Sequence, residues 1–279
     1  MCVDICSPIE GDWSLSLDIV IPAHNEERRI ERTLRAYRRG FPQDDVRFVV
    51  ALDGCVDHTS EIVRRQAGDD TRVLVHEFPK LGKGGVLMET FRRCDADLVA
   101  FVDADCATPP AELARLTELA AEADGVIASR RMPASFTPCT RRRGRSLTSS
   151  GFAWGVRHLF HLPYADTQCG AKVLHRRVAD CVVPLMSSRD FLFDVDLLLV
   201  AQRLGFAVVE VPTVWIDQEG SKLSPGRDAS RMLKSALRLW VHHRTLPVGP
   251  AAGSTPEPRE AASVADLDAV VRRVEADAA

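Results

Sequence analysis

The first half of the chain alternates short apolar runs with stretches of helical spacing, and this alternation constrains the fold more than any other feature. The run at residues 98–102 holds five residues without a charge, which is typical of a strand buried on both faces. The expected strands cover residues 17–21, 46–52, 72–76, 98–102 and 125–129, and the expected helices cover residues 27–39, 60–67, 111–122 and the stretch from Gly85 to about Cys94. Alternating strands and helices favour an α/β fold with a mainly parallel central sheet and helices on both faces.

The second half of the chain is less regular from about residue 132 onward. A helix is expected from Phe191 to about Leu204, a strand at residues 207–211 and a helix at about 229–243. The composition then changes to Ala, Pro, Glu and Asp. We therefore expect a leader at residues 1–16, one domain at 17–246, and a flexible acidic tail at 247–279 that includes a short helix near 264–275.

Composition limits the classes of protein. The formal net charge of -3 argues against a general nucleic-acid-binding protein. The longest apolar runs are much shorter than the roughly 20 residues of a membrane-spanning helix, and the N-terminus lacks the pattern of a secretion signal. The eight cysteines include no Cys-x-x-Cys pair, so reduced thiols are expected rather than a zinc site. These features predict a cytoplasmic protein.

Two carboxylates follow the apolar run at residues 98–102. Side chains alternate along a strand, so Asp103 and Asp105 leave its end on the same side and repel each other unless a cation lies between them. Oxygen ligands suit Mg²⁺ or Mn²⁺, which usually arrive with substrate phosphates. The alternative is structural, because Asp105 is also placed to begin a turn and to cap the helix that follows Pro110.

The loops after the predicted strands meet at one edge, since parallel sheets bind ligands at the carboxyl ends of their strands. A dinucleotide-binding domain needs a glycine-rich turn after the first strand, and residues 22–26 contain no glycine. A Walker loop needs Ser or Thr after its lysine, whereas Gly84 follows Lys83. Both of these nucleotide-binding classes are therefore disfavoured.

Two basic segments have open interpretations. Arg141, Arg142, Arg143 and Arg145 form a compact cluster that is either a solvated surface or a grip for a phosphorylated ligand. The helix at 229–243 either covers the core or lies on an anionic membrane surface.

Eight motifs occur in order in these loops. They are Pro22-Ala-His-Asn-Glu-Glu27, Asp53-Gly-Cys-Val-Asp-His-Thr59, Gly82-Lys-Gly-Gly85, Asp103-Ala-Asp105 with Thr108-Pro109, Ser129-Arg130, Asp166-Thr-Gln-Cys-Gly170, Phe193-Asp-Val-Asp-Leu197, and Trp215 with Gly220-Ser-Lys-Leu223. Over residues 17–245 the chain resembles the family 2 glycosyltransferases of the GT-A fold, in particular the dolichyl and polyprenyl phosphate glucosyltransferases and mannosyltransferases. Each motif alone is weakly specific, but their common order is a strong signal.

The resemblance implies a nucleoside diphosphate sugar at this edge of the sheet. Asp53 would accept the N–H of a uracil or guanine base, Asp103 would bind the ribose hydroxyls, and Asp105, with Asp103 beside it, would bind Mg²⁺ or Mn²⁺ on the diphosphate. The other implied donor-binding residues are Pro22, Ala23, Asn25, Glu26, Lys83, Ala104, Asp166, Gln168 and Lys222.

The resemblance also places Asp194, Asp196 and Arg130 among the catalytic residues. Residues two apart on a helix point away from each other, so at most one of the two aspartates faces the sugar. Asp194 is favoured, and its alternative role is that of an acid stabilised by the helix dipole. Arg130 would neutralise the charge that develops on the leaving diphosphate.

The acceptor determines whether a base is needed. A hydroxyl acceptor must lose a proton, whereas a phosphate monoester, with a second pKa of about 6, is already largely a dianion at neutral pH. A lipid phosphate therefore needs cationic guides, and the arginines of residues 141–145 would supply them.

These inferences predict an inverting, metal-dependent transfer of a hexose from UDP-glucose to a polyprenyl phosphate, with peripheral contact at the inner face of a membrane. One alternative keeps the donor and uses a soluble hydroxyl acceptor. Two others are a sugar-phosphate nucleotidyltransferase, which normally has a glycine-rich basic first loop, and an inactive nucleotide-sugar-binding module, for which the loss of Asp105 or Asp194 is expected.

Overall fold

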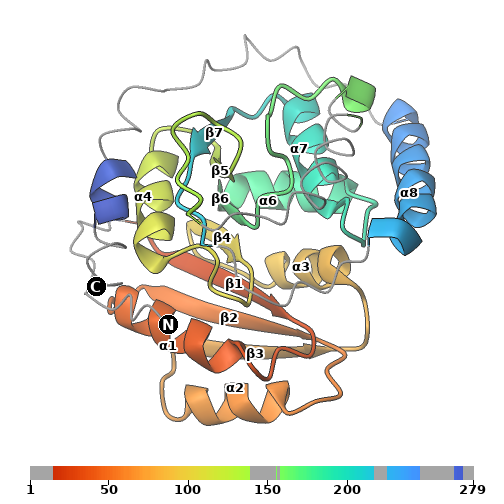
Figure 1. Cartoon of the computed structure of the whole chain (residues 1–279). Helices are drawn as coiled ribbons and strands as arrows, with labels where there is room; N and C mark the ends of the chain where they lie inside the picture. Colours follow the sequence, from red (N-terminus) through yellow and green to blue (C-terminus); the bar gives the residue numbers. More distant parts are fainter. Residues whose placement is uncertain (1–14, 139–154, 156–157, 217–224, 246–266, 273–279) are drawn as a thin grey trace.

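The computed structural model describes residues 15–138, 155, 158–216, 225–245 and 267–272 (Figure 1). The strands are β1 (Leu17–Ala23), β2 (Val46–Asp53), β3 (Val73–Phe78), β4 (Leu98–Val102), β5 (Gly125–Ser129), β6 (Ala171–His175) and β7 (Val208–Pro212). The helices are α1 (Ile30–Gly40), α2 (Thr59–Ala67), α3 (Lys83–Phe91), α4 (Pro110–Ala120), α6 (Arg176–Val182), α7 (Phe193–Leu204) and α8 (Pro225–Thr245), with a 3-10 turn at Val183–Leu185.

The strands form one seven-stranded sheet in the order β3-β2-β1-β4-β6-β5-β7. Strand β1 pairs in parallel with β2 and β4, β2 pairs in parallel with β3, and β5 pairs in parallel with β7. The mainly parallel α/β sheet predicted from the sequence is therefore confirmed. The sequence analysis missed β6 and α6, and β6 is antiparallel to both of its neighbours.

The direction of β6 matters for what lies at the edge of the sheet. Val102 at the end of β4 pairs with Ala171 at the start of β6. Because β6 runs backwards, the segment that precedes it, residues 166–170, lies at the same edge as Asp103 and Asp105. The residue after β5, Arg130, belongs to this edge as well, because β5 runs parallel to β4 and antiparallel to β6.

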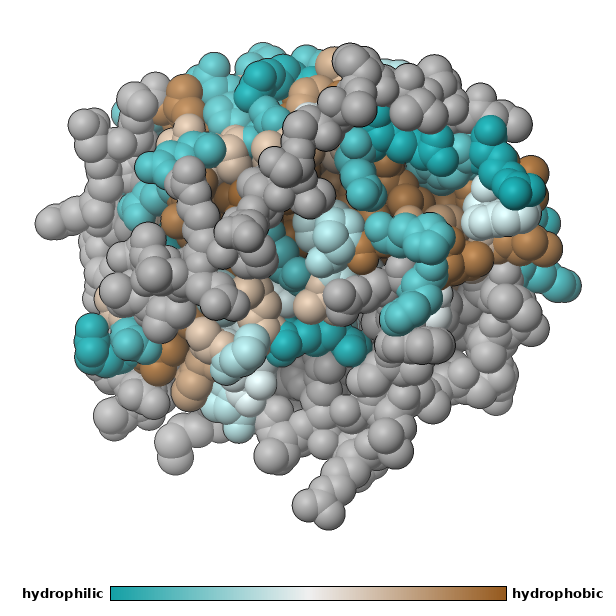
Figure 2. Space-filling view, turned by 90° about the horizontal axis from the view of Figure 1, so that it is seen from above, coloured by the Kyte–Doolittle hydropathy of each residue, from teal (hydrophilic) through white to brown (hydrophobic). Residues whose placement is uncertain are grey.

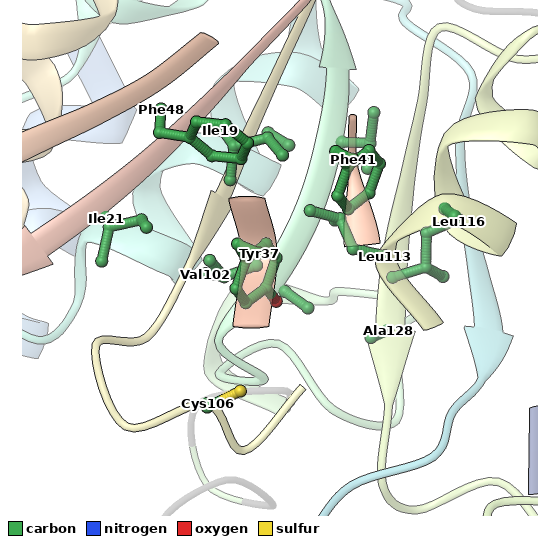
Figure 3. Close-up of a cluster of buried hydrophobic side chains, with 14 of the residues drawn as sticks. Ile19, Ile21, Tyr37, Phe41, Phe48, Val102, Cys106, Leu113, Leu116 and Ala128 are labelled. Carbon is green, nitrogen blue, oxygen red and sulfur yellow. The ribbon is translucent and has the colours of Figure 1, made fainter. Parts of the chain in front are cut away.

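Alternate residues along the central strands enter two different hydrophobic clusters, as expected for strands buried on both faces. Ile19 and Ile21 pack with α1, α2 and α4, whereas Val20 between them packs with α3, α6, α7 and α8. Figure 3 shows the first cluster, in which Tyr37 of α1 lies near Val102 of β4. The Tyr37 hydroxyl donates a hydrogen bond of 2.8 Å to the Thr108 carbonyl, so this cluster also holds the loop after β4.

A short helical segment at residues 267–272 lies beside α4 (Figure 1). Its Leu267 and Val270 are buried in the first cluster. None of the described helices is both long enough and apolar enough to cross a membrane.

A buried ion pair joins α4 to the end of β7. Arg115 Nη2 lies 2.7 Å from Glu112 Oε1, and their side chains are only 4% and 0% exposed. Arg115 also donates to the Pro212 carbonyl, and the Thr213 hydroxyl donates to Glu112. Burial raises the pKa of Glu112 although Arg115 acts to lower it, so the ionised carboxylate depends on this arginine.

We expect Arg115→Met to lower the free energy of unfolding by about 3–5 kcal/mol, because it leaves Glu112 buried without its cation. Arg92→Met is the matched control: Arg92 Nη1 lies 2.8 Å from Glu89 Oε1 at the same sequence spacing, but these two side chains are 41% and 31% exposed. We expect less than about 1 kcal/mol for it. Urea denaturation measures both, and equal losses would show that burial of the pair is not what stabilises the α4 contact.

Candidate active site

A pocket of about 300 Å³ lies at the carboxyl edge of β1, β2 and β4. Its lining consists of Pro22, Ala23, His24, Glu26, Arg29, Asp53, Lys80, Lys83, Val86, Asp103, Ala104 and Asp105. Eight of these residues belong to the donor or metal site predicted from the sequence. The sequence analysis did not assign a site role to the other four, namely His24, Arg29, Lys80 and Val86.

Lys83 and Asp103 form an ion pair within this pocket. Lys83 Nζ donates to Asp103 Oδ1 at 2.7 Å, and the two side chains are 35% and 30% exposed. Burial lowers the pKa of Lys83, but Asp103 and Asp194 outweigh this effect and raise it above its usual range. Lys83 is therefore a permanent cation at the carboxyl end of β4.

The glycines around Lys83 let its backbone approach the segment before α7. Gly82 has a φ of +83°, and a Cβ at this position would lie 2.8 Å from the Arg189 carbonyl oxygen. A Cβ at Gly84 would lie 2.8 Å from the Ser188 carbonyl oxygen. Glycine is the residue that tolerates both the positive φ and the close contact.

Asp105 lies in the same pocket with a raised pKa. The causes are its burial and the negative charge of Asp103. Arg29 Nη1 lies 4.0 Å from Asp105 Oδ2, and the Arg29 guanidinium also pairs with Glu26 at 2.6 Å. Asp105 Oδ1 accepts the Ala107 N–H at 3.1 Å, so the predicted turn is present, but no side chain caps α4.

These carboxylates fit the metal that the sequence predicts. The described residues include no group of three or more His, Cys, Asp or Glu side chains arranged to hold an ion. Mg²⁺ usually needs only one or two carboxylates when substrate phosphates complete its coordination. Two neighbouring aspartates, one with a pKa raised by the other, match that requirement.

Asp53 organises the loop before α3. Its carboxylate accepts Lys80 Nζ at 2.7 Å, the Leu81 N–H at 2.6 Å and the Gly82 N–H at 3.2 Å. Gly54, with a φ of +57°, allows the backbone of Lys80 to come close. Asp53 thus positions residues 80–82, which lead into Lys83. The sequence did not reveal these contacts of Asp53.

The loop after β1 is tied to the loop after β2. Asn25 has a φ of 55°, and its Oδ1 accepts the Val56 N–H at 2.9 Å. The Glu26 N–H donates to the Thr59 hydroxyl at 2.7 Å. Glu26 lines the pocket, whereas Asn25 is placed to hold the wall of the pocket together.

A second group of residues reaches this edge through β5 and β6. Asp166 accepts two bonds from the Arg130 guanidinium, at 2.6 Å and 2.9 Å, and Arg130 lies 5.0 Å from the centre of the Trp215 ring. Burial acts to raise the pKa of Asp166, but the contacts with Arg130 have the larger effect and hold this pKa below its usual value. Gln168 donates to the Phe191 carbonyl at 3.4 Å.

Gly170 connects this second group to the pocket. A Cβ on Gly170 would lie 2.0 Å from Asp103 Oδ2, so the Asp103 carboxylate occupies the space that a side chain would take. The adjacent Cys169 is fully buried, and burial raises the pKa of its thiol to about 12. Cys169 is therefore a protonated packing residue.

Asp194 and Asp196 point to different surroundings, as the sequence analysis predicted for residues two apart on a helix. Asp194 Oδ1 accepts Lys172 Nζ at 2.6 Å, and both side chains are almost completely buried. Asp196 instead accepts the N–H groups of Ser187 and Ser188, each at 2.7 Å, and lies 2.7 Å from His243 Nε2. Asp196 is not brought to the pocket.

Lys172 is a further charged residue that sequence reasoning missed. It is the second residue of β6, donates to the Cys169 carbonyl at 2.8 Å and packs 5.2 Å from the centre of the Phe101 ring. Five other predicted residues, Lys222, Arg141, Arg142, Arg143 and Arg145, lie outside the described residues.

Residues 18–181 match the model of glycosyl transferase family 2. Glycosyltransferase AglD of Haloferax volcanii is 33% identical over 81% of this chain and 37% of its own length, so this chain spans little more than a third of that relative. The dolichyl-phosphate beta-glucosyltransferase of Drosophila melanogaster is 28% identical over 84% of this chain and 77% of its own. The undecaprenyl-phosphate mannosyltransferase of Micrococcus luteus is 29% identical over 74% and 87%.

A solved structure has the same architecture. Glucosyl-3-phosphoglycerate synthase from Mycobacterium tuberculosis, in complex with Mn²⁺, UDP and glucosyl-3-phosphoglycerate, has a TM-score of 0.62 at 18% identity, over 84% of this chain and 81% of that chain. At this identity the comparison shows the fold alone, which is GT-A. With the family match, it follows that this chain is a glycosyltransferase and belongs to family 2.

Proposed function

We propose that this enzyme transfers glucose from UDP-glucose to a polyprenyl phosphate, with inversion at the sugar carbon and with Mg²⁺ or Mn²⁺. The observation that carries the proposal is the pocket in which Asp103, Asp105 and Lys83 converge at the carboxyl edge of the sheet. Relatives named for dolichyl and undecaprenyl phosphate support the acceptor. A fold neighbour bound to Mn²⁺ and UDP-glucose supports the donor and the metal.

In this proposal the pocket residues divide the donor among them. Pro22, Ala23 and Asp53 lie beside the uracil of the donor, and Asp103 binds the ribose hydroxyls. Asp105, with Asp103 beside it, would hold the metal, which when bound neutralises part of the charge that develops on the diphosphate. Lys83 supplies a fixed positive charge at the same place.

Arg130 is the second cation of the proposed transition state. Asp166 holds its guanidinium bidentately, and the Trp215 ring lies beside it. This arrangement orients a charge before the reaction begins, which is how preorganised electrostatics lower a barrier.

The surroundings of Asp194 favour a phosphate acceptor over a hydroxyl acceptor. A general base must reach the proton that it removes. Asp194 is 3% exposed and its carboxylate is held by Lys172, so in this conformation it does not offer a free oxygen to an acceptor. A phosphate dianion needs no such base. A soluble hydroxyl acceptor is the second candidate, because the Asp194 carboxylate lies close enough to the pocket for its negative charge to raise the pKa of Lys83.

A lipid acceptor also implies a place for the enzyme. We propose that it works in the cytoplasm, in peripheral contact with the inner face of a membrane, with the cluster of residues 141–145 guiding the acceptor phosphate. The nucleotidyltransferase and the inactive binding module are disfavoured by the family, and by the presence of both Asp105 and Asp194.

We expect Asp105→Ala to reduce Mn²⁺-dependent transfer of glucose from UDP-glucose to polyprenyl phosphate by about 100-fold or more, because a metal ligand at the diphosphate is lost. Removal of metal with EDTA should have a similar effect on the wild type. Asp69→Ala, at an exposed position, is the control and should retain activity. Mn²⁺-dependent transfer that persists in Asp105→Ala contradicts the metal assignment.

Gly170→Ala tests the position of Asp103. The new methyl group would occupy the place of the Asp103 carboxylate, so we expect UDP binding in the presence of Mn²⁺, measured by calorimetry, to weaken about tenfold or more. Gly155→Ala is the control, because a Cβ there meets no atom of the described part of the chain within 4 Å. Unchanged UDP affinity in Gly170→Ala would mean that Asp103 does not bind the donor.

Asp194→Asn separates the two acceptors. If a phosphate dianion attacks, transfer to polyprenyl phosphate should stay within about tenfold of the wild type, since no proton is removed. Loss of transfer by a factor of about 100 or more, with normal UDP binding, would instead indicate a general base and a hydroxyl acceptor. Asp194→Asn with Lys172→Met removes both buried charges and controls for the destabilisation caused by an unpaired lysine.

A further inference from the structure

Helix α8 presents to the outside a face that combines apolar and basic side chains. We call Lys234, Leu237, Arg238, Val241 and Arg244 the α8 outer face; all five side chains are exposed. Leu237 is 59% exposed and Val241 is 53% exposed. Among the described residues, the other exposed large hydrophobic side chains are Val56 and Leu159.

Helical spacing puts these five residues on one side of α8. At 3.6 residues per turn, Leu237 and Val241 lie at the centre of an arc, with Arg244 on one side and Lys234 and Arg238 on the other. Ala236, Leu239 and His243 occupy the opposite side and are buried against the body of the protein. The residues from 234 to 244 include no acidic side chain.

A helix that merely covers a core has polar residues on its outer face. An apolar centre flanked by Lys and Arg is instead typical of a helix that lies in the interface of a membrane. Trp240 is half-buried at the border of this face, and the Arg244 guanidinium lies 4.1 Å from the centre of its ring. Figure 2 shows apolar and hydrophilic residues side by side at the right of the molecule, the side on which Figure 1 places α8.

We propose that the α8 outer face is a docking surface for an anionic lipid bilayer. Leu237 and Val241 enter the boundary between headgroups and acyl chains, while Lys234, Arg238 and Arg244 contact the lipid phosphates. A second copy of the chain fits this face less well, because a two-fold interface brings the same patch of both subunits together and sets cations against cations. The proposal deepens, and in its choice of partner rests on, the proposed lipid-phosphate acceptor.

The docking surface is joined to the segment that leads into the active site. The Ser235 hydroxyl donates to Asp190 Oδ2 at 2.5 Å, His242 Nε2 lies 3.1 Å from the Leu185 carbonyl oxygen, and His243 Nε2 lies 2.7 Å from Asp196 Oδ1. Residues 185–196 in turn pack against the glycines around Lys83 and carry Asp194. A bilayer bound to α8 would therefore hold the active site in a defined orientation to the lipid.

The test is co-sedimentation of the full chain with phosphatidylcholine vesicles that contain phosphatidylglycerol and no polyprenyl phosphate. We expect the wild type to bind these vesicles about tenfold or more tightly than pure phosphatidylcholine vesicles, and to be released by high salt. Lys234→Glu with Arg238→Glu should remove the preference for anionic lipid. Leu237→Glu with Val241→Glu should weaken binding about tenfold or more. Val56→Glu, at an 88% exposed apolar position outside α8, is the control and should bind as the wild type does.

A wild type that stays in the supernatant, or variants that sediment as the wild type does, would overturn the proposal. A dimer of the wild type that Leu237→Glu dissociates, detected by analytical ultracentrifugation, would overturn it in favour of a second copy. Thermal melting of each variant checks that it folds. Glucose transfer to polyprenyl phosphate in detergent micelles is measured separately and should persist in the α8 variants. If the wild type binds the vesicles but does not transfer glucose in micelles, the proposed function is contradicted and the docking surface stands.

Discussion

The arrangement of the site depends on how the Asp103 carboxylate is held. Lys83 binds one of its oxygens at 2.7 Å, and the other oxygen fills the space left by the missing side chain of Gly170. These three residues come from the end of β4, the start of α3 and the segment before β6. The contact therefore requires that β6 run antiparallel to β4, because only then does Gly170 reach the carboxyl edge of the sheet.

Charge balance explains why cations surround this pair of aspartates. Burial and the negative charge of Asp103 together raise the pKa of Asp105, because like charges are costly in a partly buried pocket. Lys83 forms a direct ion pair with Asp103. Arg29 lies 4.0 Å from Asp105 and also pairs with Glu26. Asp105 thus has the weaker protein partner of the two, and this asymmetry is consistent with Asp105 as the main ligand for an added cation.

The strands and helices of the first half were predictable because each buried strand is a continuous apolar run and each helix has an amphipathic pattern. The eight pocket residues were predicted from the resemblance of the loops after those strands to the family 2 glycosyltransferases. Strand β6 was not predicted, because its second residue is Lys172 and a local pattern does not reveal the partner that makes the burial of this lysine tolerable. That partner, Asp194, is 22 residues away in the sequence. The anchoring of residues 80–82 by Asp53 was hidden for the same reason, since it depends on contacts between separate loops.

Asp194 and Asp196 illustrate how one helix turn serves two purposes. The sequence predicts that they diverge, and the structure gives each a different buried partner, Lys172 and His243. Asp196 fixes residues 187 and 188, whose neighbours contact Gly82 and Gly84 on either side of Lys83. An Asp196 carboxylate far from the pocket therefore supports the position of Lys83, and through Lys83 that of Asp103. The pocket built by the first half of the sheet is in this way completed by contacts that α7 and α8 supply.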